Sequence, residues 1–292
     1  MRHSDFLRLL GLASIWGASF LFMRIIAPQL GALWTAEIRV GLAGLALVGW
    51  MFVSKQPILF RQHWKSFLIL GAISTALPAV FYAYAAIHIP AGYSAIMNAT
   101  SPLWGAVMAA IFLGEQFTTR KMAGMVAGVV GVGLLVRLGP VAWSTELLLA
   151  LLSCSAATIC YALAGVYTKK LSVNVNPVLM ATASQVGGAV FLLPSLPFSP
   201  IPGTVTPTVM LAAAGLALLC SAVAYLLYFR LIHDVGPTKA LTVTFLIPLF
   251  ALLWGSIFLH EVITLNMLIG CAAVVMATWL VAYSPKKAEV IK

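Results

Sequence analysis

Two prolines, Pro102 and Pro248, stand near the middle of long apolar runs, where they could expose groups that bind a polar solute. Because proline lacks a backbone N–H and its ring crowds the preceding turn, the carbonyls of Asn98 and Thr244, four residues earlier, lose their helical donors. Inside a bilayer, such carbonyls are tolerated only against protein or a watered cavity. We therefore predict a kink at both prolines and, beside them, a site for an amide, amine or carboxylate. A packing kink, with Asn98 bonded to a neighbouring helix, is the alternative.

Aromatic side chains gather at similar depth in other runs. Trp16, Tyr82 and Tyr161 are far from the ends of their runs, and a deep tyrosine or tryptophan needs a partner for its polar atom. They could stack against a ring or an aliphatic group of a solute, or they could fill space between helices. Three other tyrosines lie closer to the ends, where anchoring at the membrane interface is expected: Tyr84, Tyr167 and Tyr228.

Glu37 and Arg39 are ionisable residues inside an apolar run. Placing such a group in a membrane costs about 2.5–3.5 kcal/mol on insertion scales, so it usually faces a cavity or a partner. A spacing of two puts them on different helix faces, so they do not pair with each other. Arg39 could bind a solute carboxylate or reach the headgroups, and we assign it a structural or gating role; Glu37 is placed to relay a proton. Gln185 is a further, uncharged candidate for solute contact.

Enzyme chemistry has few residues available, because the chain holds seven acidic residues and no Walker A motif, zinc-ligand spacing or nucleophile elbow. We expect no cofactor and no metal. A lipid-modifying enzyme such as a prenyl transferase would need paired aspartates, whereas Asp5 and Asp234 lie in different regions. That reading stays as a remote alternative. The cysteines read as packing residues within apolar runs: Cys154, Cys160, Cys220 and Cys271.

The composition is that of an all-α integral membrane protein, with 62% hydrophobic and 8% charged residues. Apolar runs of about 18 residues or more are typical of membrane-spanning helices, and their continuity argues against an alternating β-barrel pattern. We predict ten spans, at residues 6–26, 31–53, 65–87, 91–113, 119–137, 146–168, 176–195, 207–229, 237–259 and 264–283.

The net charge of +10 gives the orientation of these spans. If the first residue is cytoplasmic, fourteen of the 17 lysines and arginines fall on the cytoplasmic side. Such a bias orients membrane helices, so both termini are predicted to be cytoplasmic. The basic balance is thus a topology signal, and we expect the lipid bilayer rather than a nucleic acid as the partner.

Residues 102–134 are repeated at residues 248–280, with eleven of thirty-three positions identical at an offset of 146. The repeat divides the chain into two halves, 1–137 and 145–285, with five predicted spans in each. Because five is odd, the second copy enters the membrane from the opposite side, which predicts inverted repeats around a midplane cavity. Glu115 and Glu261, which match each other, end their spans and suit caps or gate contacts.

The paired motifs resemble the two EamA-type repeats of the drug/metabolite transporter superfamily. They read Pro102…Ile-Phe-Leu-Gly-Glu115…Gly124 and Pro248…Ile-Phe-Leu-His-Glu261…Gly270, and Trp16-Gly17-Ala18-Ser19-Phe20 with Arg39 resembles the family's opening. His260 departs from the family's glycine, which concerns only the local turn. The resemblance implies a ten-helix secondary transporter, commonly an exporter of amino acids or related metabolites.

From the resemblance and the deep aromatic residues we expect an exporter of aromatic or large neutral amino acids, similar to the YddG-like branch, in a bacterial-type inner membrane. The expected solute-binding residues are Trp16, Tyr82, Asn98, Pro102, Tyr161, Gln185, Thr244 and Pro248. A passive channel or a lipid flippase of the same fold is the alternative. Gly124 and Gly128 allow close helix approach, either within the bundle or at a dimer seam, so a monomer and a homodimer both remain open.

Overall fold

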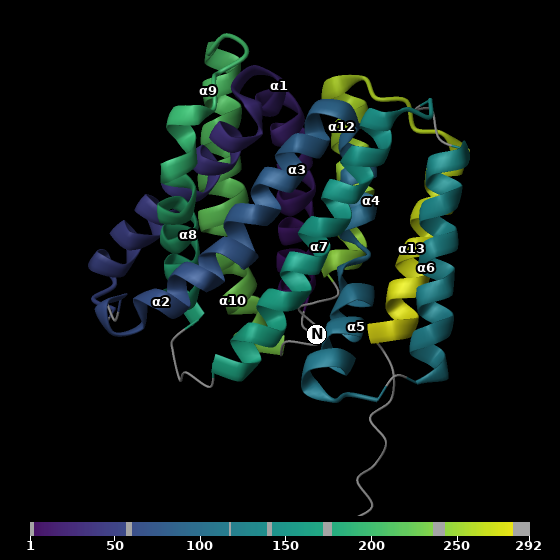
Figure 1. The fold of residues 1–292 in the computed structure, drawn as a ribbon, viewed down its shortest axis with the longest axis horizontal. Helices are drawn as coiled ribbons and strands as arrows, with labels where there is room; N and C mark the ends of the chain where they lie inside the picture. The colour runs from purple at the N-terminus through teal and green to yellow at the C-terminus, as the bar shows by residue number, and fades with distance from the viewer. Residues whose placement is uncertain are drawn as a thin grey trace, which may run out of the picture.

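The structure is a computed structural model that describes residues 3–56, 60–116, 118–138, 142–171, 177–235 and 243–282. Within these ranges all regular structure is helical (Figure 1). The elements are α1 (His3–Val53), α2 (Phe60–Gly71), the π-helix η1 (Ala72–Ala76), α3 (Leu77–His88), α4 (Ala91–Asn98), α5 (Ser101–Leu113), α6 (Thr119–Leu138), α7 (Thr145–Leu171), α8 (Pro177–Leu192), the 3₁₀-helix η2 (Leu193–Phe198), α9 (Pro207–Ala214), the π-helix η3 (Gly215–Val223), α10 (Ala224–Val235), α12 (Val243–Leu259) and α13 (Leu265–Ala282).

The prediction of an all-α membrane protein is confirmed. Six helical segments of the described residues are long and apolar enough to cross a membrane. In the described ranges the predicted apolar runs are helical, except at Ala99 and Thr100 within the run 91–113 and at Thr264, which precedes the last helix. Residues 176, 237–242 and 283 of the predicted runs lie outside the described ranges. Large apolar side chains on the outside of the bundle include Leu45, Val129 and Leu211, all more than 70% exposed. Such a surface is suited to lipid contact. The number of spans, ten, stays a prediction.

The first two predicted spans form a single element, α1, that is interrupted only at Gly31. This glycine has φ 77° and ψ 166°, a conformation that glycine adopts at little cost. The turn is held by Gly203, whose N–H donates to the carbonyl of Gln29 at 2.9 Å, and by Trp34, whose Nε1 donates to the carbonyl of Ser199 at 2.9 Å. Below, the side of the molecule where His3 lies is the N-terminal side, and the side of Gly31 is the far side.

Two spans contain π-helical turns, which the sequence pattern did not predict. The wider turn at η1 is pinned by Thr75, whose hydroxyl lies 2.7 Å from the carbonyl of Gly71 in its own span and 2.8 Å from that of Ser184 in α8. In η3, the hydroxyl of Ser221 donates to the carbonyl of Leu216 at 3.2 Å. Such π-helical turns commonly occur at functional sites, and η3 packs against α1.

A break separates α4 from α5 at Ala99 and Thr100, and Pro102 lies at the second position of α5. The carbonyls released by the break are satisfied by protein hydroxyls. Ser101 Oγ donates to the Asn98 carbonyl at 2.6 Å, Thr100 Oγ1 donates to Met97 at 2.7 Å, and Thr278 Oγ1 of α13 donates to Ala99 at 2.7 Å. The predicted break is therefore present, but the Asn98 carbonyl already has a donor and is not left for a solute.

At Pro248 no break separates two helices, because α12 continues through this buried proline as helix; the kink predicted there stays a prediction. Close packing against α1 explains why the helix persists: a Cβ added at Gly17 would lie 2.7 Å from the Cβ of Phe250. In addition, Trp254 Nε1 donates to the carbonyl of Ser14 at 3.1 Å. Neighbouring helices can thus hold a helix through one missing N–H.

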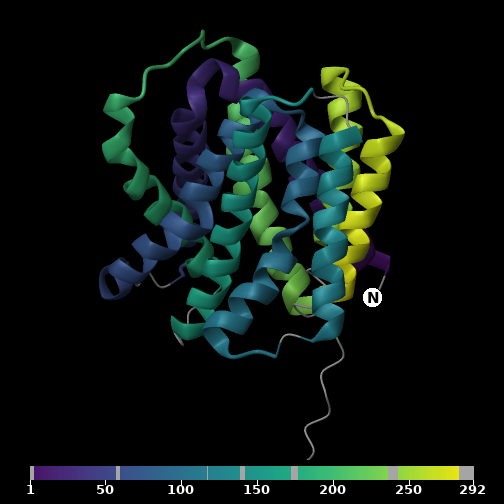
Figure 2. The same ribbon diagram turned by 45° about the vertical axis from the view of Figure 1, so that its right-hand side comes forward.

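The buried core lies mainly on the far side, where α1, α3, α4, α7 and α12 meet. Helices α6 and α13 lie side by side at one edge of the bundle (Figures 1 and 2). Gly124 and Gly128 of α6 are buried, and a Cβ at Gly128 would meet Leu103 of α5. In this structure the small residues of α6 therefore pack within the bundle.

Candidate functional site

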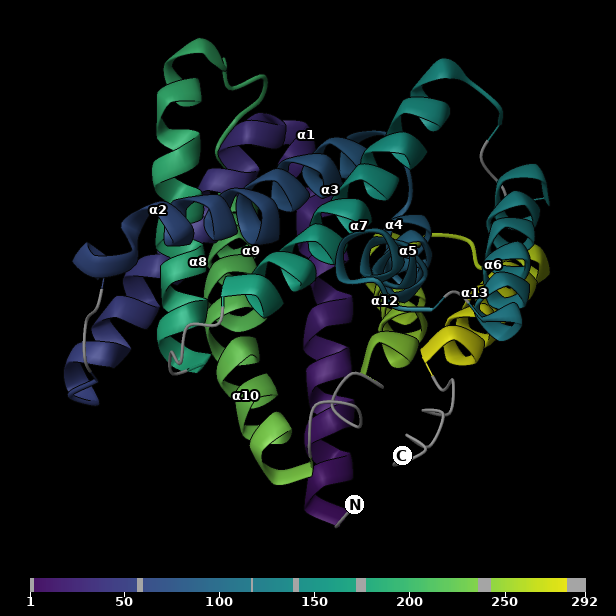
Figure 3. The same ribbon diagram turned by 60° about the horizontal axis from the view of Figure 1, so that its bottom comes forward.

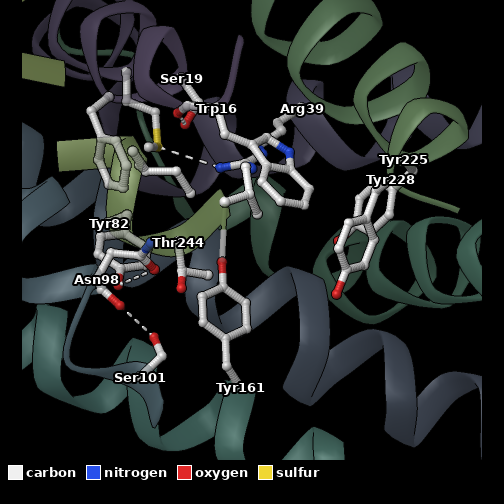
Figure 4. A pocket seen from close by; sticks show the side chains of 14 residues that line it. Trp16, Ser19, Arg39, Tyr82, Asn98, Ser101, Tyr161, Tyr225, Tyr228 and Thr244 are labelled. Atoms are coloured by element: carbon white, nitrogen blue, oxygen red, sulfur yellow. Dashed lines mark hydrogen bonds between the residues drawn. The ribbon is translucent and has the colours of Figure 1, made fainter. Parts of the chain in front are cut away.

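A cavity of about 300 Å³ lies between the two halves of the chain (Figure 4). Its walls come from both arms of α1, from α3, and from α4 and α5 on either side of their break, all in the first half. The second half contributes α7, α10 and α12. The fourteen lining residues are Trp16, Ser19, Phe20, Met23, Arg39, Tyr82, Asn98, Ser101, Tyr161, Tyr225, Tyr228, Val243, Thr244 and Ile247.

Aromatic rings form two groups in the cavity wall. The indole of Trp16 lies 5.2 Å from the ring of Tyr228 and 6.3 Å from that of Tyr225, between ring centroids. The ring of Tyr82 lies 5.5 Å from Phe20 in an edge-to-face arrangement, and it stacks on Tyr161 at 6.3 Å. These spacings are typical of favourable aromatic pairs, and they leave ring faces and edges that suit an apolar or aromatic ligand.

Asn98, the last residue of α4, brings an amide to the cavity at the helix break. Its Oδ1 accepts a hydrogen bond of 3.0 Å from the hydroxyl of Tyr82, which fixes the orientation of the side chain (Figure 4). The amide N–H groups of Asn98 have no partner among the described residues and are therefore donors within reach of a ligand. Ser101 lies one turn further on, but its hydroxyl already donates to the Asn98 carbonyl.

Arg39 reaches the cavity from the second arm of α1 (Figure 4). Its Nε lies 3.3 Å from the hydroxyl of Ser221 in η3, and its Nη1 lies 3.7 Å from the sulfur of Met23. From the sequence, Arg39 could face a cavity or reach the lipid headgroups. In the structure it lies in the cavity wall.

Six of the ten residues proposed from the sequence line the cavity: Trp16, Arg39, Tyr82, Asn98, Tyr161 and Thr244. The other four do not. Pro102 and Pro248 do not line the cavity; their effect is on the backbone hydrogen bonds of their own helices. Gln185, in α8, is 2% exposed, and its Oε1 has no partner in the part of the chain that the structure describes. Glu37 has a buried Oε2, also without a described partner, and is absent from the cavity wall.

The cavity also contains residues that the sequence reasoning missed. Trp16, Ser19, Phe20 and Met23 have the spacing i, i+3, i+4, i+7 of one helix face, and Tyr225 and Tyr228 share a face at i, i+3. That periodicity was the available signal. The expectation that Tyr228 anchors at the membrane interface is wrong, because its ring packs on Trp16 in the cavity. Val243 and Ile247, near the start of the described part of α12, complete the apolar wall.

On the far side of the bundle lies a group of contacts that we call the far-side latch: Arg24, Glu261, the N-terminus of α4 and the C-terminal carbonyls of α3. Oε1 of Glu261 accepts from the backbone N–H of Ala91 at 3.0 Å and lies 4.0 Å from Nε of Arg24. Nη1 of Arg24 donates to the carbonyls of Ala86 at 2.6 Å and Ile87 at 2.8 Å. The latch joins residues from both halves of the chain.

On the N-terminal side, the corresponding glutamate is more exposed. Glu115 lies 3.6 Å from Nζ of Lys121 and 3.3 Å from Nζ of Lys169. A further ion pair on this side joins Nη1 of Arg8 to Oδ2 of Asp234 at 2.6 Å. In the described ranges, no three His, Cys, Asp or Glu side chains are grouped as metal ligands.

Comparison with known proteins shows that the sequence of this chain is similar to those of transporters. The EamA-like transporter family matches the chain twice, at residues 6–137 and at residues 148–283. The uncharacterized transporter YvbV of Bacillus subtilis is 28% identical over 92% of this chain and 88% of its own length. The probable terminal-alkyne amino-acid exporter of Streptantibioticus cattleyicolor is 25% identical over 91% of this chain and 89% of its own length.

The fold is also similar to that of a solved crystal structure. The TM-score is 0.65 with 18% sequence identity, and the match covers 96% of each chain. At this identity the similarity concerns the fold alone.

Proposed function

The chain belongs to the EamA-like transporter family, and from this premise we propose that it exports small metabolites of the amino-acid class, aromatic or large neutral ones. The family consists of transporters, so the chain is not an enzyme and the prenyl transferase alternative is excluded. The resemblance carried by the paired Pro…Glu motifs is confirmed at the level of the family; the YddG-like branch is part of the proposal. A relative whose name is that of a probable amino-acid exporter supports the choice of solute.

The observation that carries the proposal is the cavity between the two halves. It offers stacked rings at Tyr82 and Tyr161, an amide at Asn98 and a guanidinium at Arg39. These groups match the parts of an amino acid with an apolar side chain, because the rings suit the side chain and the polar groups suit its charged end. Pockets of this type commonly combine an apolar wall with a few placed polar groups.

We assign the motion to alternating access between two inverted units, 1–137 and 145–285, with ten spans in total. The double match of the family supports this division. The bias of basic residues supports a cytoplasmic N-terminal side, with both termini in the cytoplasm of a bacterial-type inner membrane. In this arrangement the solute loads from the cytoplasm, and Tyr228 and Val243, which pack near Leu12 of the first arm of α1, are the lining residues on that side. Release then requires the far-side latch to open.

Counterflow in proteoliposomes tests the proposal. Vesicles preloaded with unlabelled phenylalanine should accumulate labelled phenylalanine in a saturable way, with weaker exchange of threonine and none of a sugar. Replacing Trp16 by alanine should reduce the exchange about 3- to 10-fold, since ring pairs contribute about 0.5–1.5 kcal/mol. Trp64, which is 57% exposed, supplies the matched control Trp64→Ala, with no expected change.

Two outcomes would contradict this proposal. Flux that does not saturate and is not reduced by competing solutes would indicate a channel. If no amino acid exchanges in vesicles that contain correctly folded protein, amino-acid transport is wrong.

A further inference from the structure

Two arginines of α1, Arg24 and Arg39, lie within the helix bundle, and their guanidinium groups have different surroundings. Arg24 donates to the carbonyls of Ala86 at 2.6 Å and Ile87 at 2.8 Å and lies near Glu261. These partners fully account for Arg24 as a member of the far-side latch.

Arg39 has only weak, uncharged partners among the described residues. The hydroxyl of Ser221 lies 3.3 Å from Nε, and the sulfur of Met23 lies 3.7 Å from Nη1. A thioether is a weak acceptor, and a guanidinium presents five N–H donors in a fixed fork. Donors therefore remain available on the cavity side of Arg39, where Figure 4 shows its side chain among the cavity-lining residues.

The charge of the cavity wall is unbalanced. Of the fourteen described residues that line it, Arg39 is the one with a full charge, and no carboxylate accompanies it. An unpaired charge inside a membrane protein is costly, so a ligand that brings one negative charge is favoured. A phosphate monoester carries nearly two negative charges and would need further cations. The balance therefore favours a single carboxylate, which matches the planar fork of arginine.

The remainder of the wall defines the body of such a ligand. Phe20, Met23 and Ile247 are apolar, and the tyrosine and tryptophan rings lie beside them. A volume of about 300 Å³ is at the lower end of the usual range for ligand pockets, which suits a small metabolite. Since the described lining residues include no acid, an ammonium group finds no counter-ion there.

We propose that Arg39 binds the carboxylate of the solute, and that the cavity selects small carboxylates with an apolar or aromatic body whether or not they carry an amino group. This inference rests on the proposed function, because it names the substrate class of the same cavity. It also differs from the sequence-based assignment of Arg39 to a structural or gating role.

The test measures binding to purified full-length protein in detergent by isothermal titration. The probes are 3-phenylpropionate, L-phenylalanine and L-phenylalanine amide, which carry the acid alone, both groups, and the amine alone. We expect both acids to bind, and the amide to bind at least about 10-fold more weakly, in keeping with the loss of a charge-assisted hydrogen bond.

Variants locate the effect. Arg39→Gln should weaken the binding of 3-phenylpropionate about 10- to 100-fold, and Arg39→Lys should retain part of the affinity, because it keeps the charge but loses the fork. Arg230→Gln removes an arginine whose side chain is 66% exposed and outside the cavity, so the affinity should not change. If Arg39→Gln does not fold, the inference is tested by the affinity of Arg39→Lys and by the comparison of the acid with the amide in the unaltered protein.

Equal binding of the acid and the amide, unchanged affinity in the Arg39 variants, or no binding of either acid would overturn the inference. The two proposals fail separately. Binding of 3-phenylpropionate that depends on Arg39, without phenylalanine counterflow, would leave the inference standing and contradict amino-acid export. Phenylalanine counterflow that the amide inhibits as well as 3-phenylpropionate does would leave export standing and contradict the inference.

Discussion

The two copies of the repeated segment, residues 102–134 and 248–280, end their first helices alike but differ at their prolines. Gly114 and His260 both take positive φ, at 67° and 55°, and the next residue, Glu115 or Glu261, donates its N–H back to the helix in each copy. At Pro102 the helix is broken, whereas at Pro248 it is continuous.

Packing explains the difference, because the two copies have different neighbours. In the first copy α5 packs against α7, α13 and α6, whereas in the second copy α12 packs mainly against α1 and α4. Figure 3, which turns the lower side of the molecule toward the viewer, shows α5 beside α7, with the pair α6 and α13 further to the right. Local sequence contributes too, because Thr100 and Ser101 donate hydroxyls to the carbonyls at the break, whereas the matching residues Leu246 and Ile247 have none to donate. Under alternating access, the broken and the continuous helix are the conformations that the two halves would exchange.

The largest expected effect comes from adding a large side chain to α4, which is more tightly packed at its glycine than α5 on the other side of the break. A Cβ at Gly92 of α4 would lie 2.4 Å from Cδ2 of Leu252, whereas one at Gly105 of α5 would meet no atom within 4 Å. Gly92→Leu should therefore lower the free energy of unfolding by about 1–3 kcal/mol through overpacking. Gly105→Leu is the matched control and should change it by less than about 1 kcal/mol. Denaturant unfolding in detergent measures both; equal effects would mean that α4 and α5 are packed alike.

The next effect concerns the carbonyls at the break. Thr278→Val removes the hydroxyl that donates to the Ala99 carbonyl and leaves a buried acceptor unpaired, at a cost of about 1–3 kcal/mol. Thr182 is equally buried, but its hydroxyl donates to the Val178 carbonyl within its own helix. Thr182→Val should thus cost clearly less in the same unfolding measurement. A Thr278→Val variant as stable as the unaltered protein would show that the break does not depend on α13.

A smaller effect is expected at the far-side latch. Glu261→Gln keeps an acceptor for the N–H of Ala91 but removes the negative charge beside Arg24, so closure should weaken by about 1–2 kcal/mol. Cys154, buried and 3.9 Å from the Ser94 hydroxyl, reports on closure of this region. Its labelling by a small thiol reagent, located by mass spectrometry, should rise about 5- to 30-fold. Unchanged labelling would show that the latch does not hold the far side closed.

The smallest effect is expected at the matching glutamate. The side chain of Glu115 is 44% exposed, compared with 16% for Glu261, and exposed ion pairs contribute about 0–1 kcal/mol. Glu115→Gln should leave both Cys154 labelling and thermal stability nearly unchanged. A response as large as that of Glu261→Gln would abolish the distinction between the two sides.

Much of the fold could be predicted because hydropathy and length mark membrane helices directly. The break at Pro102 also followed from the covalent structure of proline. The π-helical turns at η1 and η3 could not be foreseen, since they depend on contacts such as that of Thr75 with α8. The continuity of α12 through Pro248 could not be foreseen either, because it depends on packing against Gly17 and Ser14 of α1.

In the candidate site, depth in the membrane was a useful guide for Trp16, Tyr82, Asn98 and Tyr161, which all line the cavity. Depth gave the wrong expectation for Tyr228, because its ring, carried by α10, packs against Trp16 in the cavity wall. Polarity alone also placed Gln185 and Glu37 at the site, but only the helix packing decides which face of a helix meets a cavity. The periodicity of residues 16, 19, 20 and 23 was a better indicator than the individual residue types.

The single-residue turn at Gly31 has a mechanical consequence for α1, since both of its arms contribute to the cavity wall. Trp16 lies fifteen residues from Gly31 along one arm, about 22 Å at 1.5 Å per residue, and Arg39 lies on the other arm. A change of about 5° in the angle at this pivot would move the indole by about 2 Å relative to the guanidinium over such a lever arm. A rotation about the two torsions of this one glycine would therefore change the width of the cavity, and a ligand held between both arms would favour one angle.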